Sequence, residues 1–198
     1  VIWSENAAWQ NPGAPADFEI WARPLRGGVL GAPVNLSAHP GSDLNAVATT
    51  DVRGRIWVAW QGVRDGVFRI LARHQTDNGW SEEIRVSSQQ FSCWTPALAA
   101  APDGRIAIAW DTYEKGDYDI WLREFDATGV PRPPRPAATS AQYEARPAIT
   151  YDHQGKLWVS WEQSGPTWGK DWGALVRDEG IGLYRDRQIG RASCRERV

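Results

Sequence analysis

The sequence predicts an all-β chain made of repeated four-stranded antiparallel sheets. One six-residue stretch recurs as Arg55-Ile-Trp-Val-Ala-Trp60, Arg105-Ile-Ala-Ile-Ala-Trp110 and Lys156-Leu-Trp-Val-Ser-Trp161. The closing tryptophans are 50 and 51 residues apart, and a glycine precedes each copy, at Gly54, Gly104 and Gly155. A fixed period of this length indicates stacked units, none of which can bury its apolar faces alone.

Each unit reads as four short strands separated by turn residues. In the second unit we expect strands at 44–50, 55–60, 67–73 and 83–86. The third unit gives 95–101, 105–110, 118–124 and 135–139, with Pro102-Asp-Gly104 placing glycine where a tight hairpin needs a positive φ. The fourth gives 146–151, 156–161, 174–177 and 182–185, and the first keeps only part of the pattern.

The second strand of each unit distinguishes between the possible all-β architectures. In the second unit, Ile56, Val58 and Trp60 share one face while Trp57 and Ala59 share the other, and both sets are apolar. A sheet with one face in water would alternate apolar and polar residues instead. Radially stacked blades cover both faces of each sheet, so the pattern favours a β-propeller over a β-sandwich or a β-solenoid.

The repeats predict about three and a half four-stranded blades, at about 1–40, 41–90, 91–141 and 142–187. Val1-Ile-Trp3 reads as the end of a strand already under way, so we expect a fragment of a larger propeller. Residues 188–198 break the pattern and resemble a translated sequencing adapter, so we expect a non-native tail there.

Composition narrows the possible functions. The 198 residues are 42% hydrophobic and carry a formal net charge of −2, and the cations are spread along the repeats, which argues against a nucleic-acid partner. No run is long and apolar enough to span a bilayer. Outside the tail Cys93 is the only cysteine, so we expect no disulfide framework, no metal site and no cofactor.

Residues 96–110, Pro-Ala-Leu-Ala-Ala-Ala-Pro-Asp-Gly-Arg-Ile-Ala-Ile-Ala-Trp, are followed by Gly116-Asp-Tyr-Asp-Ile-Trp121. This pattern resembles the PD40 repeat of TolB-like β-propellers. The resemblance implies a periplasmic or secreted bacterial protein that serves as an interaction platform or as the front part of a larger hydrolase. Residues 168–172, Trp-Gly-Lys-Asp-Trp, also resemble repeats that lead into a metal-dependent phosphoesterase domain.

Sialidase-like glycoside hydrolases are the nearest enzyme class among propellers. Their Asp box, Ser-x-Asp-x-Gly-x-x-Trp, is absent, because Asp103-Gly104 lies in a hairpin without the serine. The active sites of that class also need an arginine triad. Arg23, Arg73, Arg123 and Arg177 recur at one strand position, which indicates a structural role in each blade.

The candidate binding residues come from two places. Gln61, Asp111 and Glu162 directly follow the repeat tryptophans, and we expect them in loops on one face of the ring. Such carboxylates could act as acid and base or hold a cation if they met, although solvated loop acids explain them as well. Trp168 and Trp172 lie outside the repeat pattern and could stack on a sugar or a partner protein.

The sequence therefore predicts a TolB-like propeller module that binds a protein or glycan partner outside the cytoplasm, with no catalytic residues in this stretch. The alternatives are a sialidase-like glycoside hydrolase and the non-catalytic propeller of a larger metal-dependent hydrolase.

Overall fold

We describe the chain from a computed structural model, in which residues 1–6, 8, 13, 17–114, 116–165 and 188–189 are described. Every named element among these residues is a β-strand, and every strand pair is antiparallel. The same residues include no apolar helix of the length that a membrane crossing requires. The predicted all-β class is confirmed.

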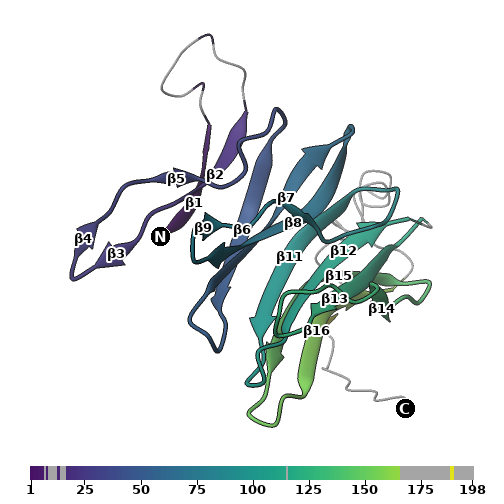
Figure 1. The fold of residues 1–198 in the computed structure, drawn as a ribbon. Coiled ribbons are helices and arrows are strands. Elements are labelled where there is room, and N and C mark those ends of the chain that lie inside the picture. Colours follow the sequence, from purple (N-terminus) through teal and green to yellow (C-terminus); the bar gives the residue numbers. More distant parts are fainter. Residues whose placement is uncertain (7, 9–12, 14–16, 115, 166–187, 190–198) are drawn as a thin grey trace.

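All described strands except β3 and β4 form four sheets that follow one another along the chain and stack side by side (Figure 1). Blade 1 contains β1 (Ile2–Asn6), β2 (Phe18–Ala22) and β5 (Val34–Asn35). Blade 2 contains β6 (Asp43–Thr50), β7 (Ile56–Arg64), β8 (Val67–Thr76) and β10 (Ile84–Arg85), with β9 (Gly79–Trp80) paired to β8. A separate ribbon joins β3 (Leu25–Arg26) and β4 (Val29–Leu30).

Blade 3 contains β11 (Cys93–Ala100), β12 (Ile106–Tyr113), β13 (Tyr118–Phe125) and β14 (Arg135–Ala138). Blade 4 contains β15 (Tyr143–Tyr151), β16 (Leu157–Ser164) and β17 (Gln188–Ile189). The strands expected at 174–177 and 182–185 lie outside the described residues. The second strand of blades 2 to 4 runs at least three residues beyond its predicted end, which moves several polar residues from expected loops into strands.

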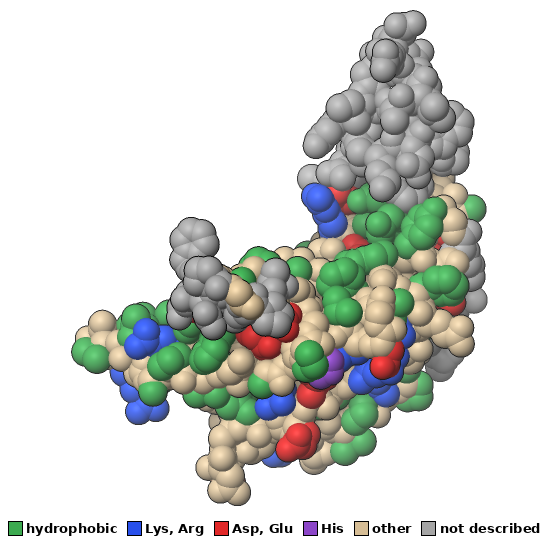
Figure 2. Space-filling view, turned by 90° about the horizontal axis from the view of Figure 1, so that it is seen from above, with side chains coloured by type: hydrophobic (Ala, Val, Ile, Leu, Met, Phe, Trp, Pro, Cys, Tyr) green, Lys and Arg blue, Asp and Glu red, His purple; other side chains and the backbone are tan. Residues whose placement is uncertain are grey.

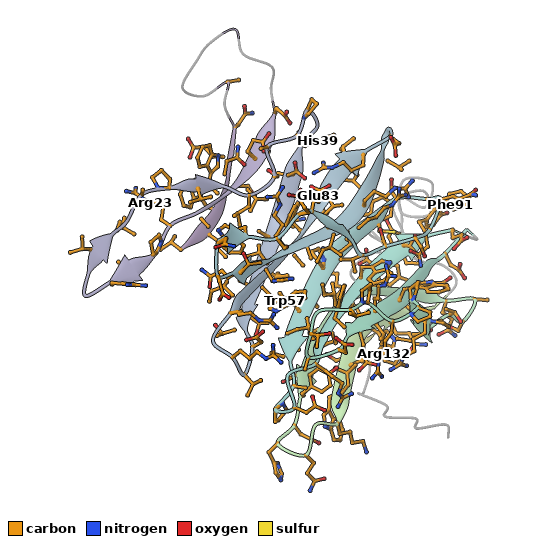
Figure 3. The ribbon with its side chains drawn as sticks, viewed as in Figure 1. Arg23, His39, Trp57, Glu83, Phe91 and Arg132 are labelled. Atoms are coloured by element: carbon orange, nitrogen blue, oxygen red, sulfur yellow. The ribbon has the colours of Figure 1, made fainter. Side chains whose placement is uncertain are left out.

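The two apolar faces of β7 pack against two different neighbours. Trp57, labelled in Figure 3, and Ala59 belong to one buried cluster with Ile106 of blade 3. Val58 and Trp60 belong to another with residues of blade 1, Ile20, Ala22 and Leu36. All four side chains on β7 are 0% exposed. Because each blade covers the next, the β-propeller architecture is confirmed.

The hairpins between the first and second strands have the predicted turn chemistry. Gly54, Gly104 and Gly155 have φ values of 79°, 89° and 76°, the region that side chains with a Cβ rarely adopt. Each glycine N–H donates to the carbonyl oxygen three residues earlier, at 2.9–3.0 Å. These glycines therefore close the hairpin between the first two strands of blades 2 to 4.

Two of the recurring arginines hold backbone rather than a ligand. Arg23 Nε donates to the carbonyl oxygen of Gly31 at 2.8 Å. Arg123 Nε donates to Arg132 O at 2.7 Å, and its Nη1 donates across to Arg85 O and Val86 O in blade 2 at 3.2 and 3.1 Å. This agrees with the structural role expected from their recurrence, while Arg177 lies outside the described residues.

Gly62 on β7 offers a sharp test of this packing. A Cβ there would overlap Asp43 Oδ1 and lie 2.8 Å from Leu71 Cδ1. The Asp43 carboxylate is held in place by Trp60 Nε1 at 2.7 Å and by the Arg64 guanidinium at 3.1 Å. We expect Gly62→Ala to lower the free energy of unfolding by about 1–3 kcal/mol, measured by urea denaturation.

Gly165 is the matched control, because a Cβ there would meet no atom within 4 Å. Gly165→Ala should leave the unfolding midpoint close to that of the wild type. Equal midpoints for the two variants would contradict the close packing around β7.

Candidate functional site

The first strand of blades 2 to 4 carries a β-bulge at an equivalent place. The strand pairing shifts between Leu44 and Val47, between Trp94 and Ala97, and between Ala145 and Ala148. The bulge residues Asn45, Thr95 and Arg146 have positive φ values of 55°, 51° and 55°. A bulge re-aims the side chains and amides around it, so these three positions need a specific partner.

The residues after the repeat tryptophans supply that partner. Gln61, Asp111 and Glu162 lie inside β7, β12 and β16, so the prediction that they are in loops is wrong. The strands continue because these polar side chains have fixed bonding partners within the stack. Gln61 is 6% exposed and Asp111 only 2% exposed, which also excludes a role as solvated loop groups.

Hydrogen bonds from these side chains join one blade to the next. Gln61 Oε1 accepts the Thr95 N–H of blade 3 at 3.2 Å and Asn45 Nδ2 of its own blade at 3.0 Å. Asp111 Oδ2 accepts the Arg146 N–H of blade 4 at 2.8 Å. We call the bonds to Thr95 and Arg146 the inter-blade hydrogen bonds, and they fix the backbone of each bulge against its neighbour.

The last of these bulges presents a charged pair. The Arg146 side chain is 56% exposed, and its Nη1 lies 3.5 Å from Glu162 Oε1. Burial raises the pKa of Asp111 to about 7; the Arg146 N–H offsets only part of this effect, and the nearby Glu162 charge adds to it. Blade 4 thus places a donor and an acceptor together over a buried acid.

Four aromatic rings gather at the same end of blades 3 and 4. The Tyr118 ring lies 5.7 Å from Trp94, 5.2 Å from Tyr113 and 5.5 Å from Tyr143, measured between ring centroids. Burial raises the pKa of Tyr118, and the Asp111 charge is the second cause, which places the rings close to that acid. Tyr113 is 42% exposed and forms the open edge of the cluster.

We call the four aromatic residues, together with Asp111, Arg146 and Glu162, the upper site. They come from the start of β11, β13 and β15 and from the end of β12 and β16, which all meet at one end of the stack. Figure 2 looks onto this end and shows hydrophobic side chains gathered on it. Phe91, which is 47% exposed, lies at this end as well (Figure 3). The residues of the upper site are Trp94, Asp111, Tyr113, Tyr118, Tyr143, Arg146 and Glu162.

Sequence reasoning found only part of this site. Asp111 and Glu162 belong to it, whereas Gln61 serves the bulges of blades 2 and 3. Trp168 and Trp172 lie outside the described residues. Trp94 stood out only as a tryptophan outside the repeat pattern. Tyr113, Tyr118 and Tyr143 were missed as binding residues, and the signal that could have found them is their position at strand ends. Among the described residues no group of three or more His, Cys, Asp or Glu could hold a metal ion.

A hollow of about 310 Å³ lies at the opposite end, between the hairpins of blades 2 to 4. Its carboxylates already accept hydrogen bonds from N–H groups of their own turns. Asp51 accepts hydrogen bonds from the backbone N–H groups of Arg53 and Arg55 and from the Trp57 indole. Asp152 accepts them from two turn N–H groups and from the Trp158 indole. The upper site is therefore the better candidate.

Comparison with known proteins supports the fold but identifies no family. The sequence matches no family model and no curated protein. A protein of unknown function from Dyadobacter fermentans has a TM-score of 0.61 at 14% identity, over 83% of this chain and 46% of its own. An ulvan lyase of polysaccharide lyase family PL25 has a TM-score of 0.53 at 9% identity, over 95% of this chain and 53% of its own.

An endo-arabinase from Bacteroides thetaiotaomicron gives a TM-score of 0.48 at 16% identity, over 81% of this chain and 65% of its own. The chain thus spans about half the length of the first two structures and under two thirds of the third. At these identities the first two comparisons support the fold alone, which agrees with the propeller that the blades define.

The buried Asp111 makes stability depend on pH. Its pKa is about 7 in the folded chain against an ordinary value of 3.8, so the folded state binds more protons between these values. The free energy of unfolding should therefore fall as pH rises from about 4 to about 7. Asp111→Asn still offers an oxygen to the Arg146 N–H, so we expect this fall to become shallower, measured by urea denaturation across that range.

Asp103→Asn is the matched control at an exposed hairpin of the same blade. There desolvation is outweighed by hydrogen bonds from Arg105, so the pKa of Asp103 is lowered. In this control the fall in the free energy of unfolding between about pH 4 and 7 should remain. Part of that fall should persist in every variant, because burial raises the pKa of Asp43 to about 6. Parallel profiles for Asp111→Asn and the wild type would contradict the burial of this acid.

Proposed function

We propose that the chain is part of a propeller that binds glycans at the upper site. The observation that carries this proposal is the four-ring aromatic cluster beside the half-exposed pair of Arg146 and Glu162. A sugar ring has a face of C–H groups that packs on aromatic rings and an edge of hydroxyls that both donate and accept. Ligand sites in proteins combine apolar or aromatic walls with a few such polar groups.

The fold comparisons add support of a general kind. The ulvan lyase, whose fold is similar at a TM-score of 0.53, is a polysaccharide lyase. The loops and strand ends of several blades meet at one side of a propeller ring. Such a surface suits a polysaccharide ligand. Function still depends on the site rather than on the fold.

Binding is favoured over hydrolysis by the state of the acids. The Asp111 side chain is almost fully buried and accepts the Arg146 N–H, so it is committed to the fold. The arginine triad of a sialidase-like enzyme would need free guanidinium groups, whereas Arg23 and Arg123 each bind backbone carbonyls. A sialidase-like hydrolase therefore has less support than a binding module.

The PD40 resemblance leads to a further part of the proposal. The Pro102-Asp-Gly104 hairpin and the strand that ends with Trp110 follow the pattern of TolB-like repeats. We accordingly propose a TolB-like blade type and a periplasmic or secreted location, with the module forming part of a larger bacterial protein. A signal peptide and further PD40 blades encoded next to this stretch would support this, and their absence from the full gene would oppose it.

Tyr113 provides the direct test of glycan binding. Truncation to alanine removes the exposed ring of the cluster and should weaken binding of any glycan found on an array by about fivefold to tenfold, because such aromatic contacts are worth about 1 kcal/mol. Val130→Ala, at a 58% exposed position away from the site, should leave binding unchanged. No glycan binding, or equal binding by Tyr113→Ala, would refute the proposal, and turnover of a fluorogenic sialoside would favour the hydrolase.

A further inference from the structure

The charge around the upper site indicates what kind of glycan it accepts, and this inference rests on the proposed function. The strand ends that build the site span residues 93–95, 111–119, 143–147 and 161–164. By sequence these spans hold two cations, Lys115 and Arg146, and six acids. The acids are Glu114, Asp117, Asp119, Glu144, Glu162 and the buried Asp111, whose pKa of about 7 leaves it only partly charged at neutral pH.

Arg146 is already neutralised in part by one of these acids. Its Nη1 lies 3.5 Å from Glu162 Oε1, and the Glu162 side chain is 27% exposed. A carboxylate or sulfate on a ligand that approached Arg146 would meet Glu162 at a similar distance. The attraction of that anionic group to Arg146 and its repulsion from Glu162 would then largely cancel, because both energies depend on distance in the same way in the same medium.

The equivalent bulge positions give no further cation. Asn45 and Thr95 occupy the places that Arg146 occupies in blade 4, and both are neutral. The bulge amides of Thr95 and Arg146 are also used, because Gln61 and Asp111 accept them. The backbone donors that often bind anions are therefore not available at these two bulges.

Uncharged hydroxyls fit the same pair well. An arginine offers only donors and an ionised glutamate only acceptors, whereas a hydroxyl does both. Two neighbouring hydroxyls of one sugar can accept from Arg146 and donate to Glu162 without separating the pair. Hydrogen bonds to ionised groups are about twice as strong as neutral ones, so this recognition is favourable.

We propose that the upper site selects uncharged oligosaccharides, with the Arg146 and Glu162 pair reading two neighbouring hydroxyls while the excess of acids on these strand ends disfavours uronates and sulfated sugars. The aromatic cluster supplies the stacking surface, and the charged pair supplies the selectivity. Arg146 and Glu162 are thus assigned as the specificity-determining residues of the site.

Matched pairs of probes test this on the intact chain. Each pair consists of a neutral oligosaccharide and its form oxidised to the uronate at C6, with gluco, galacto and manno configurations and the same linkage. Titration calorimetry should show binding of a neutral member about tenfold or more tighter than that of its uronate partner. Added salt should narrow this gap, because it screens the repulsion.

Glu162→Gln provides the second measurement. Loss of this charge should weaken binding of the neutral oligosaccharide and strengthen binding of its uronate partner, so that the preference for the neutral oligosaccharide falls by about tenfold. Glu82→Gln, an exposed glutamate outside the site in blade 2, removes the same charge and should leave the preference unchanged.

The possible failures are distinguishable. Equal or tighter binding of uronates by the wild type would overturn the selectivity and leave the glycan-binding function standing. An unchanged preference in Glu162→Gln would overturn the assignment of this residue. Absence of binding to every member of every pair and to a glycan array would overturn the proposed function together with this inference.

Discussion

The second strand of blades 2 and 3 has no face that can meet water, and the rest of the structure follows from this constraint. On β7, Trp57 and Ala59 need cover from blade 3, while Val58 and Trp60 need cover from blade 1. Burying one large apolar side chain is worth about 2–3 kcal/mol. Separate blades would lose this stabilisation, because they would leave a large apolar area exposed. The sheets therefore stack, and stacking brings strand ends that are distant in sequence to one end of the molecule.

Apolar contact alone would let neighbouring blades slide, and the inter-blade hydrogen bonds restrict this. Gln61 and Asp111 occupy the same strand position and bind the bulge amides of Thr95 and Arg146 in the following blade. Each of these two buried side chains has a hydrogen-bond partner of defined geometry in the next blade. Its consequence for function is that Arg146 projects from a fixed backbone toward Glu162, so the candidate site is built on the same contacts that hold the blades together.

Much of the fold could be predicted from the sequence, and the limits have physical causes. Periodicity and turn glycines indicated the strands and hairpins of blades 2 and 3 correctly, because burial on both faces and positive φ leave direct marks on residue type. The ends of the second strands were misjudged, since polar residues such as Gln61 and Asp111 resemble loop residues unless their partners in the next blade are known. The bulges were invisible for a similar reason, because Thr95 and Arg146 are not residues that usually adopt a positive φ. The aromatic cluster joins Trp94 and Tyr118, which the strand pairing of blade 3 brings together, to Tyr143, which only the stacking of blade 4 brings close.

The central claim is that buried side chains of one blade hold the bulge of the next. Native-state hydrogen exchange at the amides of Thr95 and Arg146 tests it most directly. The account predicts that both amides exchange as slowly as those in the middle of β7 and β12, although they sit in bulges outside the regular ladder. Exchange at the rate of an open loop would contradict it, because the inter-blade hydrogen bonds would then not hold the blades in place.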